Sequence, residues 1–582
     1  MSPDLYEHIS LQISDPIIEW KTCPVSGQKF AIFQKDREFL DTISPTFAGQ
    51  KFVIPNPILC PEERQARRLM QRNERNFYKS TCALTGKSII TNINPKLGEP
   101  VYDTKVRRWD GRDARDCGQD RDPSSSFFSQ FHALRKKVPK IALMNDNGVG
   151  NTNCEYTYDF SYGKDCYMSV EVINSENCYF CVDSCDCKFM IDCATSYYSN
   201  YCIECNDSYK LYNCAYVSNS SECTNVLFAR DCKGCSDCIG CVGLRNTNYH
   251  IFNKKVTKEE FIVYKESLFQ RLLTERDSFL AEWQSFLDQQ VKLYANFVNA
   301  DGCSGNNLFD CAEMHCCFDM KNSKNCRYFF LSANAKDSMD ITISCPKWRC
   351  YEWVTPDFGR KVCFSTFCRR STDVRYSEMC HRCTDCFGCV GLKDKQYCIF
   401  NKQYTKEEYD LTVAKIIDQM IVGGEWWEYF PAWTSSHPYN KSDAMQRYPL
   451  TKEQGLSRWY ARDDEIVAIN IPEHATTIEG ATMDTNPLTV SESIVDSVII
   501  CAETQRPYRI IKAELDLYRK IKFPLPRLHH DVRHQHRMAR RLWRSLYLRT
   551  CPVISQTLIT PYSTDYLGIV LSKEAYEKEI YG

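Results

Sequence analysis

Several features that would identify a class of protein are missing from this chain. No run of 18 or more apolar residues occurs, so we expect no membrane-spanning helix. The first residues, MSPDLYEHIS, lack the basic start and apolar segment of a secretory signal peptide. The net charge is only −1, so no overall field attracts nucleic acid. We therefore expect a cytoplasmic protein with no membrane partner.

Motifs for common reactions are also missing. The sequence contains no GxSxG, no phosphate-binding Walker loop, no GxGxxG and no HExxH. Histidine is scarce, with 11 residues in 582. No motif in the sequence therefore indicates a reaction or a substrate.

Cysteine is abundant, with 35 residues. Thiols stay mostly reduced in the cytosol, so we interpret these cysteines as packed thiols or metal ligands rather than as disulfides. Every third residue from Cys154 to Leu244 is small or apolar, and these 31 positions include 14 cysteines and no charged residue. A similar column runs from Leu308 to Leu392, with 9 cysteines in 29 positions and one charge, Lys347.

A three-residue step matches neither a helix, with its period of about 3.6, nor a strand, with its period of about 2. It indicates a coil in which one inward residue is followed by two outward ones. Cys181, Cys202 and Cys223 lie 21 residues apart, so we expect about 21 residues per coil with like residues stacked. The predicted fold class is mainly β, with two cysteine-lined parallel β-helix (solenoid) segments, helical insertions or caps, and a small zinc-ribbon or treble-clef-like module at each end.

The CxxC pairs in these columns, such as Cys178 with Cys181, would normally indicate zinc. Here the same step continues through Ser, Val and Ala, which cannot bind zinc. A coil with a small cross-section is enough to explain why cysteine is frequent at the inward positions, because cysteine packs as a small apolar side chain. We therefore favour packed thiols in the columns and keep a metal site as the alternative.

The two columns end in related sequences. Residues 232–261 and 380–409 align at a constant offset of 148, through CVGL, IFNK and TKEE. Thr257 and Thr405 each precede Lys-Glu-Glu, which predicts the start of a helix. The first such helix is expected to be long, because its apolar residues continue at helical spacing to Tyr294. These helices are expected to cover the coil ends, which would otherwise expose strand edges.

The two ends of the chain also resemble each other. The spacing from Cys60 to Cys82 equals that from His529 to Cys551, and Cys23 corresponds to Cys501. Each end therefore predicts a ribbon-like module in which zinc is a candidate cofactor. Zinc normally takes four ligands, and each module offers three. The metal ligands predicted are Cys23, Cys60 and Cys82 at one end and Cys501, His529 and Cys551 at the other.

Four features together resemble a family of uncharacterised cysteine-rich proteins with zinc-ribbon-like ends, known mainly from genomes of uncultured bacteria. They are ILCPEERQARRLMQRNERNFYKSTC, SFFSQFHALRKKVP, the cysteine columns and PLPRLHHDVRHQHRM. The resemblance covers nearly the whole chain and implies the same modular layout, without an activity. Members tend to have a second cysteine where this chain has Glu63.

Two arginine-rich segments, residues 64–79 and 533–549, predict basic helices that suit phosphate contacts. The alternative is a solvated basic face that pairs with acids elsewhere. The predicted nucleic-acid-binding residues are Arg64, Arg67, Arg68, Arg72, Arg75, Arg533, Arg537, Arg540, Arg541 and Arg544.

Outward carboxylates allow a third hypothesis, a carbohydrate-active enzyme that uses paired acids. The outward aspartates are Asp159, Asp165, Asp183, Asp186, Asp192, Asp231 and Asp237. Aspartate before an inward residue also suits turns and stacked ladders, which explains these residues without catalysis.

Taken together, the sequence favours a non-enzymatic scaffold or interaction protein, with a protein partner or self-assembly. Nucleic-acid binding and a β-helix enzyme are the alternatives. The expected divisions are a ribbon-like module (1–150), a first solenoid (151–253), an amphipathic helix (254–300), a second solenoid (301–401), a capping helix with a Trp-rich segment (402–495) and a second ribbon-like module (496–582).

Overall fold

The computed structural model describes residues 1–107, 113–145, 150–344, 347–355, 358–465 and 471–581. The chain forms two compact units, each assembled from segments that are distant in sequence. Unit 1 contains Met1–Ala142, Leu293–Asp464 and Trp543–Tyr566. Unit 2 contains Leu143–Lys292, Glu465–Leu542 and Leu567–Gly582. The terminal segment predicted as one module, 496–582, is thus shared between the two units.

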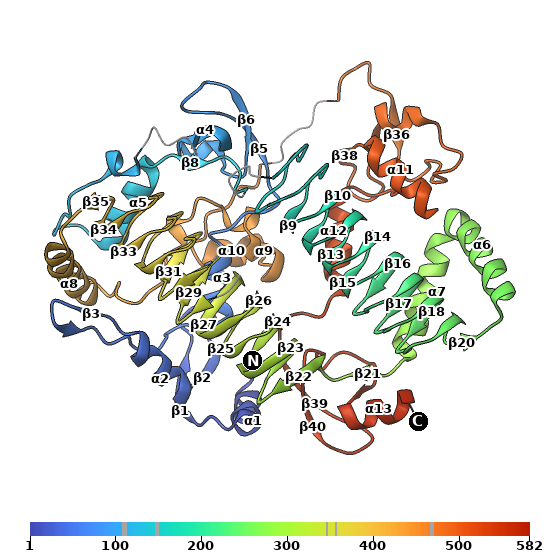
Figure 1. Ribbon diagram of the computed structural model, residues 1–582, viewed down its shortest axis with the longest axis horizontal. Coiled ribbons are helices and arrows are strands. Elements are labelled where there is room, and N and C mark those ends of the chain that lie inside the picture. The colour runs from blue at the N-terminus through green and yellow to red at the C-terminus, as the bar shows by residue number, and fades with distance from the viewer. Residues whose placement is uncertain (108–112, 146–149, 345–346, 356–357, 466–470, 582) are drawn as a thin grey trace. The chain divides into compact units, whose positions relative to one another are not determined.

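Unit 2 is organised around a twelve-stranded sheet, the teal-to-green ladder of short arrows in Figure 1. Its strands pair in parallel until the last, which folds back as a hairpin. The strands are β9 (Val170–Ile173), β10 (Glu176–Tyr179), β11 (Val182–Cys185), β12 (Lys188–Ile191), β13 (Ala194–Tyr197), β14 (Asn200–Ile203), β15 (Asn206–Tyr209), β16 (Tyr212–Ser218), β17 (Thr224–Arg230), β18 (Ser236–Val242), β19 (Asn248–Ile251) and β20 (Lys254–Lys255).

The register of this sheet gives the length of one coil. Val182 pairs with Ala194, and Ala194 pairs with Asn206 in the coil after it. The N–H of Cys181 accordingly donates to Ser169 Oγ, 12 residues earlier, and backbone hydrogen bonds between adjacent coils join residues 11 or 13 apart. Every third residue is a corner in the left-handed region, as at Asp183 and Asp186, with φ of 51° and 56°. Each coil therefore has four short sides of three residues, and each side contributes one inward residue.

The coil length predicted from the recurrence of cysteine at a spacing of 21 is wrong. Cys181, Cys202 and Cys223 are all buried, but 21 is not a multiple of 12, so they occupy different columns. The recurrence at 21 reflects frequent cysteine on the three-residue phase, not stacking. In the observed coil, the residue above Cys181 is Cys193, and the next is Cys205.

The inward side chains form a dry interior. The cysteines from Cys166 to Cys241 on the three-residue phase are 0–1% exposed. Cys193 Sγ lies 3.3 Å from the carbonyl oxygen of Ile191, two residues earlier, and Ser196 Oγ makes the equivalent contact with Ala194. Serine and cysteine are interchangeable at these positions because the coil's own carbonyl accepts their proton.

Unit 1 contains a fourteen-stranded sheet with the same plan (Figure 1). Met339 pairs with Tyr351, which pairs with Cys363, so the coil has the same length as in unit 2. The strands are β22 (Phe297–Asp301), β23 (Gly305–His315), β24 (Cys317–Lys321), β25 (Lys324–Arg327), β26 (Phe330–Ala333), β27 (Ala335–Ser344), β28 (Lys347–Trp348), β29 (Tyr351–Val354), β30 (Gly359–Arg360), β31 (Cys363–Thr366), β32 (Thr372–Arg375), β33 (Thr384–Phe387), β34 (Gln396–Ile399) and β35 (Lys402–Gln403).

Both sheets end in the same way. A final antiparallel hairpin, β19–β20 or β34–β35, is followed by a helix. The helices are α6 (Lys258–Thr274) and α8 (Lys406–Val422), and each starts with a capping box, Thr257 with Glu260 and Thr405 with Glu408. The predicted helix starts are confirmed. The prediction of one long helix after the first sheet is wrong, because the helix is interrupted at Glu275 and a second helix, α7 (Arg276–Gln289), follows.

The remaining elements are short helices and hairpins. Unit 1 adds α1 (Pro3–Ile13), β1 (Ile17–Thr22), β2 (Lys29–Phe33), α2 (Gln34–Ile43), β3 (Thr46–Phe47), β4 (Gln50–Lys51), α3 (Pro61–Leu69), β5 (Tyr78–Thr81), β6 (Ser88–Thr91), β7 (Val101–Tyr102), α4 (Thr104–Arg107), α5 (Phe127–Lys137), β8 (Lys140–Ile141), α9 (Asp443–Arg447), α10 (Lys452–Ser457), β39 (Tyr547–Thr550) and β40 (Thr557–Thr560). Unit 2 adds β36 (Thr477–Glu479), β37 (Val498–Ile500), β38 (Pro507–Tyr508), α11 (Lys512–Ile521), α12 (His530–Arg540), β41 (Val570–Leu571) and α13 (Lys573–Tyr581).

Each unit has two large apolar cores among its described residues. One fills the inside of the coil, and the other lies between the outer face of the coil and the elements that cover it. Unit 1 has a further small cluster around Cys82, Ile89 and Val101. In unit 1 the second core includes Leu69 of α3, Phe127 of α5 and Met420 of α8. In unit 2 it includes Leu515 of α11 and Val532 of α12. The protein is mainly β, as predicted, with 32% of residues in strands and 27% in helices. Within the described residues, no helix combines the length and apolar character needed to cross a membrane.

We predict that Gly305→Ala strongly destabilises the unit 1 coil. Gly305 has φ of +142°, and a Cβ there would lie 1.7 Å from the carbonyl oxygen of Cys317 in the next coil. Because that oxygen belongs to a paired strand, we expect a cost of at least about 3 kcal/mol. The matched control is Gly27→Ala, at φ +69° with open space around it, which should cost only about 1 kcal/mol. Urea unfolding followed by hydrogen exchange of β23 and β24 measures both, and equal effects would contradict this account.

Candidate functional site

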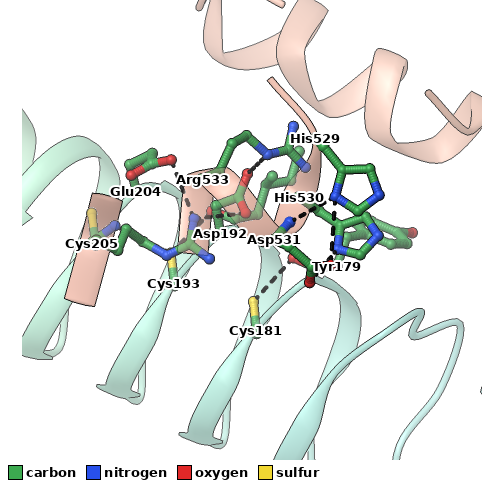
Figure 2. Close-up of polar contacts among 12 residues, drawn as sticks. Tyr179, Cys181, Asp192, Cys193, Glu204, Cys205, His529, His530, Asp531 and Arg533 are labelled. Carbon is green, nitrogen blue, oxygen red and sulfur yellow. Dashed lines mark hydrogen bonds and ion pairs between the residues drawn. The ribbon is translucent and has the colours of Figure 1, made fainter. Parts of the chain in front are cut away.

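In unit 2, helix α12 lies on the coil through buried ion pairs (Figure 2). Arg533 Nε is 3.0 Å from Asp192 Oδ2, and Arg537 Nη1 is 2.7 Å from Asp192 Oδ1. Arg537 also lies 3.2 Å from Glu204 Oε1, and Arg540 pairs with the same carboxylate. The side chains of Arg537 and Asp192 are both 0% exposed.

The spacing of the two acids matches the coil, and the spacing of the arginines matches the helix. Asp192 and Glu204 occupy equivalent left-handed corners one coil apart, so they stack in successive coils. Arg533 and Arg537 are one helical turn apart on one face of α12. One helical turn rises about 5.4 Å and one coil about 4.8 Å, so successive arginines meet successive acids.

Unit 1 repeats this arrangement with α3. Arg64 Nε is 2.8 Å from Asp340 Oδ2. Arg68 lies 3.3 Å from both Asp340 and Glu352, and its side chain is 0% exposed. Asp340 and Glu352 are also left-handed corners one coil apart. Arg72, beyond the end of α3, pairs with Asp443 at 3.3 Å. Both units therefore use the same stacked-acid and helix-arginine lock, which we call the arginine clamp.

The other predicted arginines lie at the edges of these clamps. Arg67 pairs with Glu428 at 2.7 Å, Arg541 with Asp207, and Arg544 with Asp319. Arg75 is half-buried beyond α3. The predicted helices 64–79 and 533–549 are too long, because α3 ends at Leu69 and α12 at Arg540. Apart from Arg75, the predicted arginines pair with acids of the same chain, but Arg68 and Arg537 are fully buried and do not form a solvated basic face.

Burial raises the pKa of several carboxyl groups in and beside the arginine clamps. Burial raises the pKa of Glu514, which faces Arg533 from α11, to about 7 despite the opposing charge of the arginine. Burial likewise raises the pKa of Glu352 in unit 1 to about 7, although Arg68 opposes the shift. Burial also raises the pKa of Asp192, against Arg533 and Arg537. The clamp therefore includes acids that are costly to ionise in place.

The predicted zinc ligands fall into four hairpin turns, not two modules of three. Cys23, Cys82, Cys501 and Cys551 each donate their N–H to the carbonyl of the fifth residue onward, at 2.8–3.0 Å. The structure brings Cys60 to the first turn, where Ser26 Oγ lies 3.6 Å from Cys60 Sγ. It brings His529 to the turn at Cys501, where the backbone N–H of His529 lies 3.2 Å from Cys501 Sγ. Cys82 is joined instead by the N–H of Asp103, at 3.3 Å.

These turns resemble metal-binding hairpins whose second ligand has been replaced. The N–H groups around Cys82 lower the pKa of its thiol to about 7, overcoming the effect of burial. Ser26, Thr85 and Thr504 stand where a second cysteine would complete a CxxC pair, and each hydrogen-bonds the preceding cysteine. A zinc ion needs four donors, and the described part of the chain brings no such set together at these turns. The residues present therefore do not fit a closed structural zinc site.

Within the described residues, one group of three metal-ligating side chains is close enough to share an ion: His529, His530 and Asp531. Its geometry serves the helix. The N–H of Asp531 donates to His529 Nδ1 at 3.1 Å, which caps α12, and Asp531 pairs with Arg506 at 3.0 Å. His530 stacks on Phe180 of the coil at 5.1 Å (Figure 2 shows the two histidines above Tyr179). Burial lowers the pKa of His529 to about 3.

Several of the outward aspartates that suggested an enzyme accept hydrogen bonds from the adjacent coil instead. Asp165 accepts a hydrogen bond from Asn153 at 2.9 Å, one coil below, and Asp237 accepts one from Asn225 at 3.1 Å. Asp183 accepts from the Tyr197 hydroxyl at 2.9 Å. These three carboxylates join adjacent coils, and Asp192 is used in the arginine clamp.

Sequence reasoning missed the acids of the clamp as a set. Asp192 was noted only as an outward carboxylate, and Glu204, Asp340 and Glu352 were not singled out. The available signal was two acids one coil apart, each directly before an inward position, paired with arginines four residues apart. With the period taken as 21, that signal was hidden.

The site and the fold thus define a cysteine-rich, mainly β protein in which basic helices are locked onto coiled parallel sheets. A comparison with protein-family models gives no match, and a search of curated proteins finds no similar sequence.

We predict that Arg537→Met destabilises unit 2 by about 3–5 kcal/mol, because it leaves Asp192 and Glu204 buried without their shared partner. The control is Lys210→Met, which removes an exposed pair with Glu222 on the same coil and should cost less than about 1 kcal/mol. Hydrogen exchange of β12 to β15 during urea unfolding measures the difference. A cost for Arg537→Met as small as the control would mean that the clamp does not hold the helix.

The raised pKa of Glu514 predicts a pH-dependent contribution to stability. The folded state binds this proton more tightly than the unfolded chain, whose carboxyl has a pKa of about 4.3. The contribution is therefore complete below pH ~4 and is lost as the pH rises through about 7. We expect Glu514→Gln to become more stable relative to wild type by about 2–3 kcal/mol between pH 4.5 and pH 8.

Urea unfolding of unit 2 across this pH range, followed by hydrogen exchange, measures the relative stability. The control is Glu503→Gln, a half-exposed carboxylate beside His536, which should show a much flatter difference. A flat profile for Glu514→Gln would show that burial does not raise the pKa of this carboxyl in the folded state.

Proposed function

We propose that the protein is a non-enzymatic scaffold or interaction protein built on two cysteine-rich β-solenoids, with zinc-ribbon-derived turns at the segments that join and cover them. One observation carries the proposal: the groups that would bind nucleic acid or perform acid–base chemistry are engaged inside the structure. The arginines of α3 and α12 are paired with acids of their own units.

Exposed aromatic side chains supply the binding surface in this proposal. On the unit 2 coil, Tyr162, Tyr198 and Tyr212 are 58%, 51% and 49% exposed. Tyr198 stacks edge-on against Tyr209 at 5.4 Å, and Tyr212 against Tyr201 at 5.8 Å. Exposed tyrosines held in rigid ladders lose little entropy on binding, which suits recognition of a protein partner. A second copy of the chain is one such partner.

The experiment compares wild type with the double variant Tyr198→Ala/Tyr212→Ala. Sedimentation measures self-association over a concentration series, and crosslinking with quantitative mass spectrometry compares the proteins retained from the native host. We expect the double variant to lose an association that wild type shows. The matched control is Trp459→Ala, which removes an aromatic side chain that is 92% exposed in unit 1 and should retain the association.

Labelled RNA and DNA, titrated over a salt series, test the competing class. Phosphate contacts would give affinity that falls steeply with salt. Tight, salt-dependent binding of wild type, or an association unchanged in the tyrosine variant, would overturn the proposal.

A further inference from the structure

Eight cysteines of the unit 2 coil occupy neighbouring inward positions. Neighbours are either 12 residues apart, and so lie one coil apart in one column, as Cys202 pairs with Cys214, or three residues apart, on adjacent sides of one coil. In this order they are Cys154, Cys166, Cys178, Cys181, Cys193, Cys205, Cys202 and Cys214. We call these eight residues the thiol chain. They link successive coils along one side of the tube and cross between neighbouring sides twice.

Backbone geometry sets the distance between these sulfurs. Cys181, Cys193 and Cys205 occupy one column in successive rungs (Figure 2), and rungs of a sheet are about 4.8 Å apart. Backbone N–H groups of the next coil point at the sulfurs: the N–H of Cys178 lies 3.4 Å from Cys166 Sγ, and that of Cys205 lies 3.5 Å from Cys193 Sγ. Such donors stabilise sulfur in its thiolate form.

This arrangement discriminates between metals. Zinc and iron–sulfur clusters need about four ligands around one centre, but in the described part of the protein no three cysteines converge on one point. Each sulfur between the two ends of the thiol chain has one neighbour on either side. A spacing of about 4.8 Å is about twice a metal–sulfur bond of ~2.3 Å, so an ion midway between two rungs reaches both sulfurs in a line. Linear, two-coordinate binding is typical of monovalent ions with a filled d shell, and Cu(I) is the one that thiolates select.

Charge balance favours the same ions. Each monovalent ion replaces one thiol proton, which is released to solvent: R–SH + M⁺ gives R–S–M + H⁺, with no change of oxidation state. An alternating run of sulfur and metal at equal numbers is neutral. Neutrality matters because Cys178, Cys181, Cys193 and Cys205 are 0% exposed, and an uncompensated ion buried there would be strongly unfavourable.

The thiol chain also has an accessible end. Cys154 is the first inward cysteine of the coil and is partly exposed, whereas the inward cysteines that follow it in the thiol chain are buried. A soft ion can therefore exchange onto Cys154 and move inward from thiol to thiol, each step making one metal–sulfur bond and breaking another.

We propose that the thiol chain from Cys154 to Cys214 is a binding site for soft monovalent metal ions, with Cu(I) as the physiological class, held in two-coordinate positions between coils. This site is independent of the tyrosine surface and of the scaffold role, so either proposal can fail without the other.

The test titrates the folded full-length protein with Ag(I) in chloride-free buffer, and with Cu(I) under anaerobic conditions. Native mass spectrometry counts the bound ions, and a pH-stat counts the released protons. We expect several ions per chain, about one proton released per ion, and retained hydrogen-exchange protection of β10 to β16. Equimolar Zn²⁺ should not displace Ag(I).

Cys181→Ser removes the sulfur that stands between Cys178 and Cys193 in the thiol chain, so it should lower the count by about two ions. Cys317→Ser is the matched control. Cys317 is an equally buried inward cysteine of unit 1, with its thiol hydrogen-bonded to the carbonyl oxygens of His315 and Cys326, and its loss should leave the count unchanged. Equal losses in the two variants, displacement by zinc, or uptake only with loss of exchange protection would each overturn the proposal.

Discussion

The left-handed corner at every third residue is the constraint on which the structure depends. A residue other than glycine in this conformation costs about 1–2 kcal/mol, and the two coils contain dozens of them. The parallel hydrogen bonds between coils offset this cost, and side chains at the corners add to the compensation. Asn174 reaches Asp186 in the next coil, and Asn307 reaches Asp319 at 2.7 Å. Asparagine and aspartate are the non-glycine residues that best tolerate this conformation. The left-handed corners and the hydrogen bonds between adjacent coils therefore favour the same two residue types.

The corners also determine the interior. Four inward residues per coil leave a cross-section that mostly admits small side chains, with an occasional larger one such as Trp353 or Met190. Cysteine suits this space because it is small, apolar and able to donate to the carbonyl two residues earlier. The same narrowness places sulfurs in register from rung to rung. Packing thus stacks thiols one coil apart, as at Cys181, Cys193 and Cys205.

On the outside, the coil presents a regular row of corners to its covering helices. Stacked acids at Asp192 and Glu204, and at Asp340 and Glu352, meet arginines that are one helical turn apart. Buried ion pairs of this kind add little net stability, because the loss of hydration opposes the attraction between the charges. They do penalise any other register strongly, since a shifted helix would leave charges buried alone. The recurrence of this arrangement in both units indicates that the duplication seen near residues 232–261 and 380–409 extends to how each coil holds its helix.

The sequence by itself determined the mainly β class, the inward phase of every third residue and the helix starts at Thr257 and Thr405. These features depend on local chemistry: which residues tolerate burial, and which side chain caps a helix. It did not determine the coil length, because 12 and 21 are both multiples of three and the composition of the columns does not distinguish them. Only the backbone pairing of Val182 with Ala194 does so. The destination of the arginines was also decided by tertiary structure, since Arg64 and Arg537 bind acids that lie 276 and 333 positions away in the chain. A charge pattern shows that a helix needs a counter-charge, but only the folded chain determines whether phosphate or its own carboxylates supply it.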